Sequence, residues 1–139
     1  MNNVTSQYSA TIASYLTRAA AIAKRSGLSV QVETPYLRLQ RRASSASLLL
    51  HPTHIVLEII EVEPHERYKR YGSAMLDDVI AIAEALGLRI DLIAESTTLR
   101  EQRGLVQSTL ESWYRRHEFV GPNDALMRRT PTNRRVQLR

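Results

Sequence analysis

The sequence predicts one domain of the α+β class, with a mixed, mostly antiparallel sheet, a central β-α-β unit and helices on both faces. A chain of 139 residues suits a single hydrophobic core. Short alternating apolar segments dominate its first half, and one strand-helix-strand succession occupies the second. We expect the domain to cover residues 1–129 and residues 130–139 to form a basic, flexible tail.

Hydrophobic periodicity and turn residues predict the elements of the first half. Apolar residues spaced by three and four predict a helix over residues 7–25, with Gly27 as its left-handed cap. Alternating residues on both sides of Pro35 predict strand, and the proline indicates an edge or a bulge. The stretch "RRASSAS" (41–47) predicts a turn, and residues 48–50 a short strand.

The second half contains the strongest strand signal, "IVLEIIEV" at residues 55–62. It is β-branched and mostly apolar, which predicts a central strand buried on both faces. An amphipathic helix that closes at Gly87 follows, and then another strand, so the two strands should be parallel. The remaining predicted elements are that strand at 88–94, a helix at 105–117 and a hairpin of 119–120 with 125–129.

Composition excludes several classes of protein. The absence of cysteine excludes disulfides and thiolate zinc sites, and no apolar run approaches the about 20 residues of a membrane span. The net charge of +5 equals the five arginines of residues 128–139, so the basic character describes the predicted tail. A protein that binds nucleic acid through this tail and through the basic loop at residues 67–70 is one hypothesis, which we favour less than the two given below.

The N-terminal segment has no acidic residue before Glu33 and is rich in Ser, Thr and Ala. This composition resembles that of an organellar transit peptide. We prefer an ordinary first helix, because the sheet needs a helix to cover it. No secretory segment is visible, so we expect a cytoplasmic location.

A basic loop precedes the second predicted helix, in the stretch "ERYKRYGSAML" (66–76). Arg67, Lys69 and Arg70 gather where the free N–H groups of a helix already favour an anion. In a β-α-β unit this loop lies beyond the carboxyl end of the strand, where ligands bind. Gly72 would let a ligand approach the backbone closely, so the loop predicts a phosphate or pyrophosphate site.

The loop resembles the pyrophosphate-binding signature of the GNAT acyltransferase superfamily, Arg/Gln-x-x-Gly-x-Gly/Ala. Arg67 takes the first position and Gly72 the last, whereas Arg70 stands where the family places glycine. The segment "SWYRRHEFVG" (112–121) is similar to a later stretch of the family, in which a tyrosine precedes a phenylalanine by five residues, here Tyr114 and Phe119. The resemblance covers residues 55–129.

The resemblance implies an N-acyltransferase that moves an acetyl group from acetyl-CoA to an amine without a metal. The acceptor is a small molecule, a protein lysine or a protein N-terminus. The central strand would pair with the pantetheine, and the loop and helix start would hold the pyrophosphate. The binding residues implied are Ile60, Glu61, Val62, Arg67, Tyr68, Lys69, Arg70, Tyr71, Gly72 and Ser73.

The catalytic candidates are Tyr114 and Glu58. By family position Tyr114 is the acid for the leaving thiolate; alternatively it packs beside Trp113 with its hydroxyl at the surface. Glu58 is our candidate base, because it alternates in phase with Ile60 and burying a carboxylate needs a reason. Glu61 is the second choice. Candidate partners that would leave either carboxylate without a chemical role are Arg38 and Arg89.

Two further expectations concern partners. A GNAT-like domain that has lost activity and binds another protein is the alternative function. The family usually has glycine at the position of Arg70 and at the position just before Phe119, which is Glu118 here. A homodimer through the late hairpin strands is also open. The four histidines are scattered and have no third ligand, which argues against a metal site.

Overall fold

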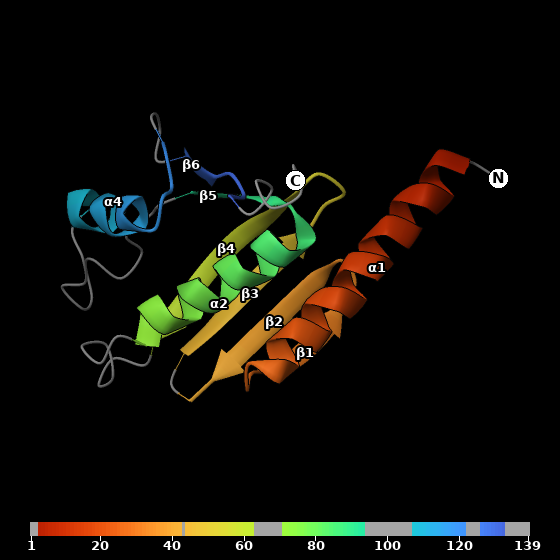
Figure 1. Cartoon of the computed structure of the whole chain (residues 1–139), viewed down its shortest axis with the longest axis horizontal. Coiled ribbons are helices and arrows are strands. Elements are labelled where there is room, and N and C mark those ends of the chain that lie inside the picture. The colour runs from red at the N-terminus through yellow and green to blue at the C-terminus, as the bar shows by residue number, and fades with distance from the viewer. Residues whose placement is uncertain (1–2, 43, 63–70, 94–106, 122–125, 133–139) are drawn as a thin grey trace.

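A computed structural model of the chain describes residues 3–42, 44–62, 71–93, 107–121 and 126–132 (Figure 1). Three helices and six strands occur in these residues. The helices are α1 (Asn3–Arg25), α2 (Tyr71–Leu86) and α4 (Gln107–Arg116). The strands are β1 (Ser29–Glu33), β2 (Tyr36–Arg41), β3 (Ser44–Leu50), β4 (His54–Val62), β5 (Arg89–Ile93) and β6 (Leu126–Arg129).

The strands form one six-stranded sheet in the order β1-β2-β3-β4-β5-β6. Every neighbouring pair is antiparallel except β4 and β5, which are parallel and joined through α2. The predicted α+β class, the mixed sheet and the central β-α-β unit are confirmed. None of the helices in the described parts of the chain is long and apolar enough to cross a membrane.

The core lies between the sheet and two helices that contact each other, α1 and α2 (Figure 1). The predicted stripe of α1 is buried at Ile12, Leu16, Ala19 and Ala23, and that of α2 is buried at Met75. Both helices cover the same face of the sheet, α1 over β1 to β3 and α2 over β3 to β5.

The central strand shows this one-sided burial. Ile55 and Leu57 of β4 are buried, whereas Val56 is half-buried and Glu58 and Glu61 are exposed. The prediction of a strand buried on both faces is therefore wrong within the described residues. Although most residues of this strand are apolar, they alternate between the face of the sheet that the helices cover and the open face.

Two turns differ from their predicted positions. The strand around Pro35 is a hairpin, in which Val30 lies opposite Leu39 and Glu33 opposite Tyr36. The turn predicted for the whole of residues 41–47 is shorter, because β3 already begins at Ser44. Small side chains in this part of β3 fit beneath the helices, which is why a polar stretch can be a covered strand.

The first helix begins at Asn3, four residues before its predicted start, but the predicted C-terminal ends of the first two helices agree with the structure. Gly27 and Gly87 have φ angles of 89° and 71°, the left-handed conformation that closes α1 and α2.

The late hairpin is present as an antiparallel bridge between Val120 and Arg128. Both backbone N–H groups of this bridge donate, with N···O distances of 2.7 and 2.8 Å.

Candidate functional site

The parallel strands β4 and β5 separate soon after they begin. They pair only at His54–Arg89, Ile55–Ile90 and Val56–Asp91. β4 continues to Val62 and stays paired with β3 on its other side. Within the described residues, the β5-facing edge of β4 therefore has no strand partner after Val56. Such an edge presents unpaired backbone donors and acceptors to an extended ligand.

A β-bulge in β4 lies where the two strands separate. Leu57 is opposite Leu48, and Ile59 is opposite Ser47, so Glu58 is an extra residue without a Cα partner on β3. A bulge bends its strand and increases the local twist. This bend explains how β4 can stay bound to β3 while it leaves β5.

The bulge also changes which residues share a face. Before it, Ile55 and Leu57 point to the covered face; after it, Ile60 does so, because it lies opposite the buried Ala46. The expectation that Glu58 shares a buried face with Ile60 is wrong, and its side chain is exposed. Glu58 is thus at the bend itself and open to solvent.

The predicted anion loop falls largely outside the described residues. This applies to Arg67, Tyr68, Lys69 and Arg70. Tyr71 and Gly72 form the first residues of α2, and Ser73 follows in the same turn. The free N–H groups of this helix start are adjacent in sequence to the predicted loop, as an anion site requires.

Ser73 connects this helix start to α4. The indole Nε1–H of Trp113 donates to Oγ of Ser73 at 3.0 Å. His117 directly follows α4. Its Nδ1–H donates to the carbonyl oxygen of Trp113 at 3.0 Å, and its Nε2 lies 3.6 Å from Oδ1 of Asp77 on α2. These contacts hold α4 beside the first turns of α2.

Tyr114 lies in this same contact region and is 8% exposed. Its ring packs against Trp113 and Phe119, with centroids 4.8 and 5.5 Å apart. Burial raises the pKa of Tyr114 to about 12, so its hydroxyl is protonated at neutral pH. No described residue forms a hydrogen bond with that hydroxyl. The packing beside Trp113 is thus as expected, but the residue is buried and its proton remains available.

The other predicted site residues have clear positions. Ile60 is half-buried on the covered face, whereas Glu61 is exposed and lies opposite Ser45. Arg89, a candidate partner for Glu58, instead donates to both carboxylate oxygens of Asp91, at 2.9 and 3.2 Å. The hydrogen bond to Asp91 raises the pKa of Arg89. The proposed pairing with Arg89 is therefore not made.

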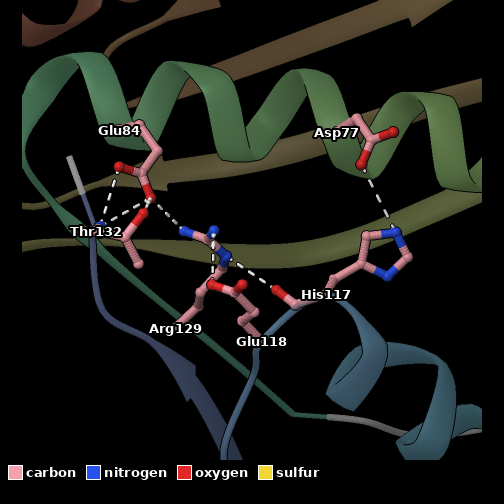
Figure 2. Close-up of polar contacts among 6 residues, drawn as sticks. All are labelled: Asp77, Glu84, His117, Glu118, Arg129 and Thr132. Atoms are coloured by element: carbon pink, nitrogen blue, oxygen red, sulfur yellow. Dashed lines mark hydrogen bonds and ion pairs between the residues drawn. The ribbon is translucent and has the colours of Figure 1, made fainter.

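Sequence reasoning missed a buried arginine beside this region (Figure 2). The guanidinium of Arg129 donates to Glu84 of α2 at 2.6 Å and to the carbonyl oxygen of His117 at 2.9 Å. It also lies 3.4 Å from Oε1 of Glu118. Arg129 is 8% exposed, so it is a structural cation and does not belong to a solvated basic segment.

The chain after β6 continues this network. The backbone N–H of Thr132 donates to Glu84 at 2.9 and 3.0 Å, and its hydroxyl donates to the same carboxylate. Thr132 belongs to the segment predicted as a free tail. Its contacts show that residues up to Thr132 are docked on α2, and the rest of the predicted tail lies outside the described residues.

Comparison with known proteins supports the fold. No protein-family model matches this sequence, and neither does any curated protein. Among solved structures, the chain is similar to the crystal structure of the anti-CRISPR protein AcrVA5, with a TM-score of 0.56 and 21% sequence identity. The match covers 67% of this chain and 96% of AcrVA5. At this identity the likeness is one of fold.

Proposed function

We propose that this protein is a GNAT-type N-acyltransferase that binds acetyl-CoA in the gap between β4 and β5. The separation of these strands after Val56 carries the proposal. Among the described residues, it leaves the edge of β4 that faces the gap unpaired from Leu57 to Val62, a length that suits an extended pantetheine. The start of α2 lies beyond the carboxyl end of the same strand, on the side where a pyrophosphate would follow.

The reaction would be direct attack of an amine nitrogen on the thioester carbonyl carbon. The new C–N bond forms, the C–S bond breaks, and one proton leaves the amine while the sulfur gains one. In this scheme Glu58 accepts the proton of the amine. Its exposure at the bend of β4 leaves it accessible to an acceptor from solvent.

Tyr114 is suited to stabilise the leaving thiolate. A thiol has an ordinary pKa of about 8.5, so full proton transfer from a phenol with a pKa of about 12 is uphill. A protonated hydroxyl in a largely dry site is nevertheless a strong hydrogen-bond donor to a developing negative charge. We therefore assign Tyr114 the role of donor to the sulfur, with a solvent proton completing the exchange.

The test combines binding with turnover. Acetyl-CoA should raise the melting temperature in a concentration-dependent way, because it binds only the folded state. Mass spectrometry of a cell lysate incubated with the protein and isotope-labelled acetyl-CoA should then reveal labelled amines. An unchanged melting temperature with acetyl-CoA, CoA and longer acyl-CoAs would refute the proposal. Binding of CoA without transfer to any amine would favour the inactive, partner-binding alternative.

A further inference from the structure

The first strand leaves one edge of the sheet open. β1 is the terminal strand, and no described residue pairs with its outer side. Natural proteins protect such edges with proline, lysine or a bulge, and Ser29–Glu33 contains none of these. Val32 points to the side of α1, yet it is 46% exposed. The edge is therefore both unpaired and partly apolar.

A groove runs along this edge between β1 and α1. Its volume is about 370 Å3. The residues that line it are Leu16, Thr17, Ala20, Ala21, Lys24 and Val32. Small and apolar side chains dominate the lining, so a neighbouring strand that brings an apolar residue to this side would remove Val32 from water.

We propose that β1 pairs antiparallel with β1 of a second copy of this chain, about a twofold axis at Gln31. The sequence Ser29-Val30-Gln31-Val32-Glu33 is almost symmetric about its central residue. In this register Val30 lies opposite Val32 of the second copy, and the two Gln31 side chains meet. The arrangement is isologous, as most dimer contacts are.

The charge of β1 favours a second copy of the chain as the partner and favours the register centred on Gln31. Glu33 is the one charged residue of β1, and in this pairing it faces Ser29 of the second copy, whose hydroxyl can donate to the carboxylate. Two like charges would not meet. A shift by one residue would place the valines of the two copies on opposite faces and separate their α1 helices. The central register thus uses all five residues and joins the two grooves.

The oligomeric state of the full chain tests the proposal. Sedimentation equilibrium should show a concentration-dependent dimer. Val32→Lys should raise the dimer dissociation constant by at least about tenfold, because each dimer covers this valine twice. Val120→Lys is the matched control: Val120 is 74% exposed in the late hairpin and should leave the dimer intact. A monomer at every concentration, or a dimer broken only by Val120→Lys, would overturn the proposal.

Single cysteines test the register, since the chain contains no cysteine of its own. Gln31→Cys should form an intermolecular disulfide under mild oxidation, because paired Cα atoms are close enough for this bond. Ser29→Cys alone should cross-link poorly, but a mixture of Ser29→Cys with Glu33→Cys should form a heterodimer. Equal cross-linking of all three single variants would contradict the register, and no cross-linking would contradict the pairing.

Discussion

The indole N–H of Trp113 donates a hydrogen bond to the hydroxyl oxygen of Ser73 at 3.0 Å, although the two residues lie 40 positions apart in the chain. The bond joins α4 to the first turn of α2. Trp113 also packs its ring against Tyr114 and against His117, with centroids 4.8 and 5.6 Å apart. The residue that orients the candidate catalytic tyrosine is thus fixed to the helix start that follows the predicted pyrophosphate loop.

Ser73→Ala should lower the free energy of unfolding by about 1 kcal/mol, because it leaves a half-buried indole N–H without its acceptor. Urea unfolding followed by tryptophan fluorescence measures this directly, since Trp113 is the chain's single tryptophan. Ser14→Ala, at an exposed position of α1, is the control and should change the free energy by less than about 0.5 kcal/mol. Equal effects of the two changes would contradict the assigned role.

Tyr114→Phe should reduce kcat for acetyl transfer by about 100-fold, which is typical for the loss of one donor to developing charge. Binding of acetyl-CoA should be unchanged, and the free energy of unfolding should change by less than about 1 kcal/mol, because the hydroxyl has no partner among the described residues. Steady-state kinetics and a thermal shift assay separate the two effects. Tyr36→Phe, on an exposed position of β2, is the control. Unchanged kcat would remove Tyr114 from the mechanism.

Glu58→Gln should lower kcat by about 100-fold, as expected for a lost general base, while stability changes by less than about 0.5 kcal/mol because the side chain is exposed. Glu61→Gln is the comparison, since Glu61 is the second candidate base and another exposed carboxylate of β4. The comparison is made at saturating acetyl-CoA. If Glu61→Gln were the damaging change, the base would be Glu61; if neither mattered, the base would lie elsewhere.

Arg129→Met should cost about 3 kcal/mol of unfolding free energy, because it leaves Glu84 without its buried guanidinium. Arg128→Met is the control on the neighbouring residue. Arg128 lies on the open side of the sheet, with its side chain 55% exposed and 3.5 Å from Asp91, so its loss should cost less than about 1 kcal/mol. Urea denaturation of both variants gives the difference. Similar costs would show that Arg129 is not a buried anchor.

His54→Asn should make stability less sensitive to acid. Burial lowers the pKa of His54, and His51, Arg89 and Arg128 act in the same direction, although Asp91 opposes them. With a pKa below 6.5 in the folded state, His54 takes up a proton more readily when unfolded, so stability falls as pH decreases through about 6.5. Unfolding free energies at about pH 7.5 and about pH 5 should differ more in the natural sequence than in the variant. An identical difference in both would refute this.

Periodicity was sufficient for the elements around the candidate site. The helix α2 follows from its amphipathic pattern, and the parallel pairing of β4 with β5 follows from the order strand, helix, strand. The bulge at Glu58 could not be predicted, because nearly every neighbour in "IVLEIIEV" is apolar. A bulge that shifts the alternation of side chains by one residue cannot be seen in a sequence whose residues are nearly all apolar. Thus the residue types were recognised, but the face of Glu58 was not.

Arg129 shows a different limit. In the sequence it stands among other arginines and looks like part of a solvated end. Its burial depends on a carboxylate 45 residues earlier in the chain, Glu84, which only the folded sheet brings close. One signal was present: Met127 and Arg129 share a face of β6, and Met127 is apolar. An arginine in phase with a core residue is a reason to look for a distant acid.

The extra residue in β4 has a consequence for the length of the chain. If Glu58 were deleted, Leu57 would be followed directly by Ile59 and Ile60, and every remaining side chain of β4 would keep its present face against β3. We therefore expect the deletion to keep the core contacts of β4 and to remove the bend that accompanies its separation from β5. A single inserted residue would then account for both the paired and the unpaired edge of this strand.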